Sequence, residues 1–126
     1  MSFEWTSYIQ LADELISYQR TPNLQEAYFR SAISRSYYGV FCIARNFLVI
    51  RRVPIPKVDT HKHVRDKYWK SANRAEKKIG KDMLDLWRER KDADYEDGAT
   101  IDINRARTAH EMAKRILERL RSIGAV

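Results

Sequence analysis

The densest group of chemically active side chains lies in the segment LWRERKDADYED, residues 86–97. Its cations and the groups that follow them are Arg88, Arg90, Lys91, Asp92, Asp94 and Tyr95. Guanidinium and ammonium groups hold phosphate oxygens, and a tyrosine ring stacks on nucleic-acid bases. Carboxylates beside such cations orient them through charge-assisted hydrogen bonds. The segment is therefore a candidate anion site, with Asp92 and Asp94 as supporting residues.

A second group lies in SAISRSYYGVF, residues 31–41, where Arg35 interrupts a strongly apolar run and is followed by Tyr37 and Tyr38. A guanidinium keeps its proton, so it must be paired or hydrogen-bonded if it is buried. Two interpretations stay open. Either Arg35 and Tyr38 help to bind nucleic acid, or Arg35 pairs with Asp92 or Asp94 and locks two helices together.

The histidines show no ligand spacing. His61 and His63 are two residues apart at an expected helix start and do not share a face, whereas His110 lies on an apolar helix seam. We expect His110 to be a core or interface residue, and we leave the roles of His61 and His63 open. The sequence has no glycine-rich phosphate loop and no GxSxG motif, so we predict neither a metal nor a cofactor. The single cysteine, Cys42, lies in an apolar segment and is expected to be a buried thiol.

The positive charge is concentrated in the middle of the chain. The formal net charge is +7, and residues 57–91 carry twelve Arg or Lys against six acidic residues. Such a local excess suits an anionic partner, namely RNA, DNA or an acidic protein. A solvated helix surface explains it equally well.

Composition and length indicate one helical domain, residues 1–126. An apolar fraction of 44% with 11% aromatic residues argues against disorder. Four glycines and three prolines give little of the turn punctuation that an all-β protein needs. No apolar run approaches the roughly 18 residues of a membrane span, and the first residues do not resemble a signal peptide. We therefore expect a cytoplasmic protein without a membrane partner.

Apolar residues recur at spacings of three and four and predict about five helices, four long and one short. Thr21 and Pro22 should start the second helix, and Asp59 or Thr60 the third. Residues 95–100 should form a loop before a last helix that Thr100 or Asp102 caps. The expected helices cover residues 3–18, 23–51, 61–70, 73–93 and 103–120. The predicted fold class is all-α, an up-and-down helical bundle.

Three features together resemble the HEPN family, the "higher eukaryotes and prokaryotes nucleotide-binding" domains. They are SRSYYGVF on a long second helix, an Arg-rich helix end, and ADY before a capped final helix. The resemblance extends from Trp5 to Leu120. It implies an up-and-down bundle, usually dimeric, with a polar site near the end of the fourth helix that faces the twofold mate.

Many HEPN proteins are metal-independent endoribonucleases in which an arginine stabilises phosphate charge and a histidine moves the proton of the RNA 2′-hydroxyl. Arg90 matches that arginine, but Tyr95 stands five residues later where histidine would fall, and Lys91 stands where Asn, Asp or His is usual. Tyrosine titrates near 10, so only about one molecule in a thousand is ionised at neutral pH. Tyr95 therefore does not replace the histidine as a base.

The leading hypothesis is a HEPN-like domain that binds RNA or a nucleotide and is catalytically degenerate. It would be a homodimer in a toxin-antitoxin or defence system, with a nucleotidyltransferase-type antitoxin as partner. Arg88, Lys91, Arg35 and Tyr38 would hold nucleic acid around Arg90 and Tyr95. One alternative is an active metal-independent endoribonuclease toxin with Arg90 and Tyr95 as its catalytic residues. The other is a structural protein-interaction module with an Arg/Asp latch.

Overall fold

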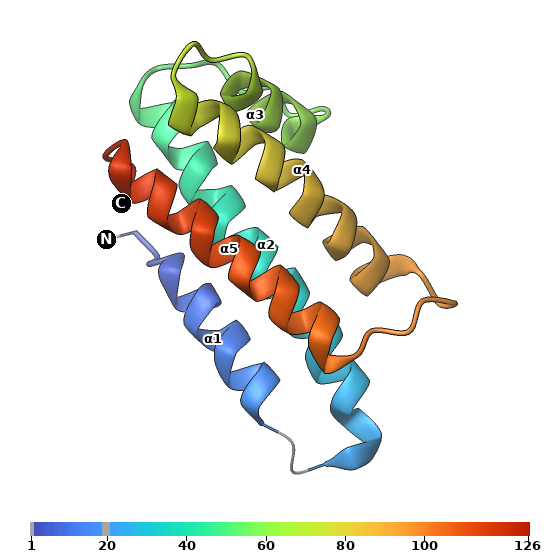
Figure 1. Ribbon diagram of the computed structural model, residues 1–126. Helices are drawn as coiled ribbons and strands as arrows, with labels where there is room; N and C mark the ends of the chain where they lie inside the picture. Colours follow the sequence, from blue (N-terminus) through green and yellow to red (C-terminus); the bar gives the residue numbers. More distant parts are fainter. Residues whose placement is uncertain (1, 19–20) are drawn as a thin grey trace.

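The computed structural model of the chain describes residues 2–18 and 21–126 (Figure 1). These residues form five α-helices and one short 3₁₀ turn, and they contain no strand. The elements are α1 Thr6–Ser17, η1 Pro22–Leu24, α2 Gln25–Ile50, α3 Thr60–Trp69, α4 Arg74–Tyr95 and α5 Ile103–Ser122. The predicted all-α bundle of four long helices and one short helix is confirmed.

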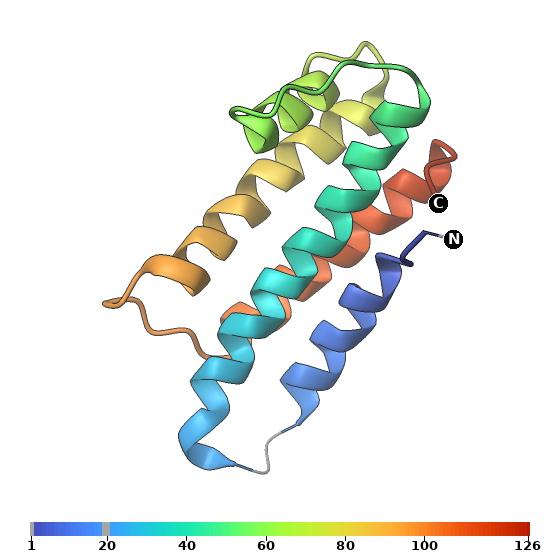
Figure 2. The same ribbon diagram turned by 180° about the vertical axis from the view of Figure 1, so that it is seen from behind.

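The four long helices run side by side, and each is antiparallel to the long helix before it in the chain (Figures 1 and 2). The central pair is α2 and α5, because both contact α1 on one side and α4 on the other. The short α3 lies across the start of α4, near the end of α2 (Figure 2).

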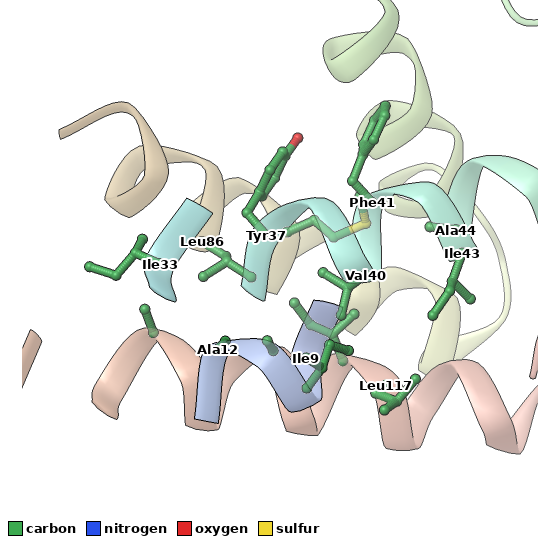
Figure 3. Packing of buried hydrophobic residues seen from close by; sticks show 14 of the residues in the cluster. Ile9, Ala12, Ile33, Tyr37, Val40, Phe41, Ile43, Ala44, Leu86 and Leu117 are labelled. Atoms are coloured by element: carbon green, nitrogen blue, oxygen red, sulfur yellow. The ribbon is translucent and has the colours of Figure 1, made fainter. Parts of the chain in front are cut away.

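The core fills the space between α2 and its neighbours. Ile9 of α1, Val40 of α2 and Leu117 of α5 meet on one side of α2 (Figure 3). The rings of Tyr37 and Phe41 leave α2 on the opposite side, away from α1 and α5 (Figure 3). Tyr37 and Phe41 thus extend the hydrophobic core from α2 towards α3 and α4.

The helix starts follow the expected capping chemistry in part. The side chain of Asp102 accepts a hydrogen bond from the Arg105 amide at 2.8 Å, so Asp102, and not Thr100, caps α5. Neither Thr21 nor Asp59 makes a side-chain cap bond. Asp59 adopts a left-handed backbone conformation with φ of 53°, and Thr60 donates its hydroxyl to the Pro56 carbonyl at 2.9 Å. The chain thus enters α3 through a tight turn.

Gly80 sets the distance between α3 and α4. A Cβ atom at this position would lie 2.5 Å from the Trp69 amide nitrogen and 2.9 Å from the Arg65 carbonyl oxygen. Only a residue without a side chain lets the two backbones approach this closely. The packing of α3 on α4 at Gly80 therefore positions every side chain that α3 presents to the end of α2 and the middle of α4.

Candidate functional site

Arg90 lies in the last two turns of α4, at the centre of a cluster of hydroxyl and carboxylate groups. Its Nε donates to Asp94 Oδ2 at 2.9 Å, and its Nη2 donates to the hydroxyls of Tyr38 at 2.7 Å and Tyr95 at 3.3 Å. The guanidinium also lies 5.0 Å from the Tyr38 ring centre and 5.3 Å from that of Tyr95. We call Arg90, Tyr38, Asp94 and Tyr95 the arginine corner. The structure thus brings together four of the predicted site residues.

One nitrogen of the Arg90 guanidinium remains able to donate a hydrogen bond to a ligand. The side chain of Arg90 is 11% exposed, and its Nη1 makes no hydrogen bond with the described residues. Among buried side-chain nitrogens and oxygens of these residues, only Arg65 Nη1 lacks a partner, so Nη1 of Arg90 reaches the surface. Asp94 also accepts a hydrogen bond from Ser34 Oγ at 3.3 Å, which together with Arg90 compensates its charge. Tyr95 is 67% exposed beside these groups.

Tyr95 belongs to a helix and not, as expected, to a loop. α4 continues through Tyr95 because Arg30 of α2 supplies donors to the carbonyls at its end, those of Asp92 at 3.3 Å and Ala93 at 3.1 Å. The same guanidinium donates to the carbonyls of Glu96 and Ala99 beyond the helix. Tyr95 is therefore held in helical register, one turn beyond Lys91.

The predicted pairing of Arg35 with Asp92 or Asp94 is wrong. The guanidinium of Arg35 lies 4.8 Å from the ring centre of Tyr8 on α1, and Arg35 makes no ion pair within the described residues. It lines a shallow hollow with Arg30, Ser34 and Asp94 without bonding to the carboxylate. The sequence did not indicate a role for Arg30, because Arg30 binds backbone carbonyls, which every residue type has.

Three further predicted residues lie outside the arginine corner. Asp92 accepts from Arg105 of α5 at 3.0 Å, and Arg105 also bonds Glu89, so Asp92 joins α4 to α5. The side chain of Arg88 is 66% exposed, with Asp85 at 3.9 Å as its nearest carboxylate. Lys91 Nζ lies 4.6 Å from the ring centre of Trp87.

The structure adds His61 of α3, whose role the sequence left open. Its ring stacks on Phe41 with centroids 4.2 Å apart, and its Nδ1 lies 2.6 Å from the Tyr37 hydroxyl. His61 and Arg90 both line a groove of about 630 Å³ between α3 and α4. The complete lining is Lys57, Asp59, Thr60, His61, Lys62, Arg65, Trp87 and Arg90. The spacing of residues in the sequence does not indicate that His61 and Arg90 line the same groove, because their approach depends on the close packing of α3 on α4 at Gly80.

Burial and neighbouring cations keep His61 neutral. Burial lowers the pKa of His61, and the positive charges of Arg90 and Arg65 lower it further. Burial raises the pKa of Tyr37 far above its ordinary value, so Tyr37 keeps its proton at neutral pH. The groove therefore contains a neutral imidazole between fixed positive charges.

The other histidines lie away from the arginine corner. His110 is buried on the inner seam of α5, with Nδ1 3.3 Å from Ser36 Oγ, which confirms the expected core position. His63 Nε2 lies 3.0 Å from the Pro54 carbonyl oxygen. Cys42 is buried, as expected. Within residues 2–18 and 21–126, no three His, Cys, Asp or Glu side chains are grouped so that they could hold a metal ion.

No helix in the described part of the chain has the length and hydropathy of a membrane span. Comparison with known protein families, with curated proteins and with solved structures finds no match to this chain.

Proposed function

We propose that the protein is a HEPN-like domain that binds RNA or a nucleotide through the arginine corner. One observation carries this proposal: Arg90 is fixed by Asp94 and Tyr38 with Nη1 left for a phosphate oxygen, beside the exposed ring of Tyr95. A fixed guanidinium binds phosphate with little loss of side-chain freedom. A ring beside it offers a face on which a base stacks.

The charge around the corner supports an anionic ligand. The groove that Arg90 shares with α3 is lined by four Lys or Arg side chains and one carboxylate, that of Asp59. This groove lies within the segment that carries most of the net charge of +7. Such a field attracts polyanions and raises their rate of association.

The same geometry supports binding without catalysis. Tyr95 occupies the place of the histidine expected from the family resemblance, and its hydroxyl is 3.3 Å from a guanidinium nitrogen that donates to it. We propose that the corner is catalytically degenerate and holds RNA without cutting it.

Binding of a fluorescent single-stranded RNA across a series of salt concentrations tests this function. Several phosphate contacts require that the affinity falls steeply as salt rises. Arg90→Gln should lower the affinity by about tenfold or more, since hydrogen bonds to charged groups contribute about 1.5–3 kcal/mol. Arg107→Gln is the matched control, because it removes an equal charge from an exposed side chain of α5, outside the arginine corner and the groove. Absence of RNA binding at low salt, or equal losses in both variants, would contradict the proposal.

We further propose that the protein acts as a homodimer in a toxin-antitoxin or defence system with a nucleotidyltransferase-type partner, in the cytoplasm. The family resemblance supports this assembly, together with the exposed ring of Tyr95 at the end of α4. Sedimentation equilibrium of the purified chain measures the oligomeric state. A mass of one chain at tens of micromolar would contradict the dimer.

A further inference from the structure

One buried donor in the groove has no partner in the protein. Arg65 Nη1 is the only buried side-chain nitrogen or oxygen of the described residues that lacks a hydrogen bond. The guanidinium of Arg65 lies 4.7 Å from the ring centre of Trp87, and the side chain makes no ion pair within the described residues. Nε and Nη2 of Arg65 make no hydrogen bond with the described residues either, and neither is a buried unpaired atom, so both reach the surface and can donate to a ligand in the groove that Arg65 lines.

The contact between Tyr37 and His61 fixes which imidazole nitrogen carries the proton. Tyr37 is fully buried, and the 2.6 Å contact with His61 Nδ1 is the only hydrogen bond of its hydroxyl within the described residues. If Nδ1 carried the proton, the buried hydroxyl hydrogen would have no acceptor, which is costly. Tyr37 therefore donates to Nδ1, and the neutral His61 carries its proton on Nε2.

His61 Nε2 is free to donate to a ligand. It makes no hydrogen bond with the described residues, and it is not a buried unpaired atom, so it reaches solvent. An imidazole in this tautomer cannot accept a proton at Nε2, and its Nδ1 is occupied by Tyr37. In this state His61 is a donor to an anion and not a base.

The remaining charges of the groove favour an anion with several oxygens. Lys62 is paired with Asp66 at 3.3 Å, whereas Lys57 and Arg65 have no ion pair in the described chain. The free donors thus come from the turn before α3, from α3 itself and, at Arg90, from α4. Donors that approach from different elements suit a tetrahedral phosphate better than a planar carboxylate.

We propose that the groove between α3 and α4 is a phosphate-binding subsite in which His61 Nε2, Arg65 and Arg90 Nη1 donate to one phosphate group. This inference rests on the proposed function and deepens it, since it names the residues that hold the phosphate next to the arginine corner. Tyr37 is a positioning residue that fixes the His61 tautomer. The shared ligand chemistry is a phosphate ester, supplied either by a mononucleotide or by an RNA chain.

Imidazole NMR signals of the unmodified protein test the subsite directly. Titration with inorganic phosphate, with adenosine monophosphate and with a short single-stranded RNA should shift the ring signals of His61 and leave those of His63 in place. His63 is the internal control, because it lies two residues away on the same helix and contacts Pro54 outside the groove. No shift of the His61 signals at saturating ligand would overturn the proposal without relying on any variant that fails to fold.

Two matched pairs of variants extend the test to affinity. His61→Gln should weaken the binding of adenosine monophosphate by about tenfold, whereas His63→Gln should change it by less than about twofold. Arg65→Gln should weaken binding similarly, whereas Lys67→Gln, on the exposed face of α3, should not. Calorimetry measures the affinities, and circular dichroism shows whether each variant is folded. Equal affinities within each pair of folded variants would contradict the subsite.

The outcomes separate this inference from the proposed function. If RNA binds through Tyr95 but neither phosphate nor RNA shifts His61, the subsite is wrong and the RNA-binding function stands. If adenosine monophosphate binds through His61 but RNA does not bind, the subsite stands and the RNA-binding function is wrong. If both bind and both depend on His61, the groove holds a phosphate of the RNA chain.

Discussion

The guanidinium of Arg30 on α2 donates to the backbone carbonyl of Ala99, 2.6 Å away in the connection between α4 and α5. It also donates to three other carbonyls at or beyond the end of α4, those of Asp92, Ala93 and Glu96, in the region where a helix has few backbone donors left. One side chain thus completes the end of α4 and fixes the start of the connection to α5. Three members of the arginine corner, Arg90, Asp94 and Tyr95, lie in the two turns of α4 that this contact secures.

Arg30→Met should destabilise the fold, because four carbonyl groups lose a charged donor at once. We expect a loss of about 1.5–3 kcal/mol in the free energy of unfolding, the range for hydrogen bonds to charged groups. Arg35→Met is the control, since Arg35 only stacks on Tyr8 and should cost less than about 1 kcal/mol. Urea denaturation followed by circular dichroism measures both. A larger loss at Arg35 than at Arg30 would contradict the assignment of Arg30 as the residue that joins α2 to α4.

Gly80→Ala should also destabilise the protein, because a methyl group at this position would overlap the backbone of Trp69. Forcing a methyl group into such a contact costs about 1–3 kcal/mol. Gly98→Ala is the matched control, since no atom lies within 4 Å of its added Cβ. The same urea experiment compares them. The imidazole NMR signal of His61 is a separate readout, and it should shift in Gly80→Ala because α3 moves away from α4. An unchanged signal would contradict the role of Gly80 in placing α3.

The periodicity and composition of the sequence were enough to predict the helices and their buried faces. Apolar residues at spacings of three and four predicted the helices, and Ile9, Val40, Met83 and Leu120, one from each long helix, are all buried. Arg90, Asp94 and Tyr95 lie at spacings of four and five on one helix, so their meeting was predictable once α4 was extended to Tyr95.

What the sequence could not predict depends on how helices far apart in the chain pack. The bond between Tyr37 and His61 requires that α3 docks at Gly80, and the contact of Arg30 with Ala99 requires the register of α2 against α4. Neither pair is marked by a local motif. One interpretation of Arg35 made it a latch to Asp92 or Asp94. The face of α2 that meets the end of α4 instead carries Arg30, Ser34 and Tyr38, which are spaced by four residues, and Arg35 lies beside this face.

The stability of the protein should fall as the pH drops from about 7.5 to about 5.5. Burial lowers the pKa of both His110 and His61 in the folded state, so the unfolded chain binds more protons below the ordinary histidine value of about 6.5. The free energy of unfolding therefore decreases as the pH falls through that value. His110→Gln should make the decrease shallower, as urea denaturation at several pH values would show. An increase in stability over this pH range would have the wrong sign for two histidines buried in their neutral form.

RNA incubated with the purified protein in EDTA should remain intact, as gel electrophoresis of a labelled strand would show. Cleavage without a metal needs a group that takes the proton of a 2′-hydroxyl. His61 Nδ1 accepts from Tyr37 while Nε2 already carries a proton, and the Tyr95 hydroxyl accepts a hydrogen bond from Arg90 Nη2. The alternative of an active endoribonuclease with Arg90 and Tyr95 as its catalytic residues predicts cleavage that is resistant to EDTA and is lost in both Arg90→Gln and Tyr95→Phe. Cleavage that persists in both variants would instead come from a site outside the arginine corner.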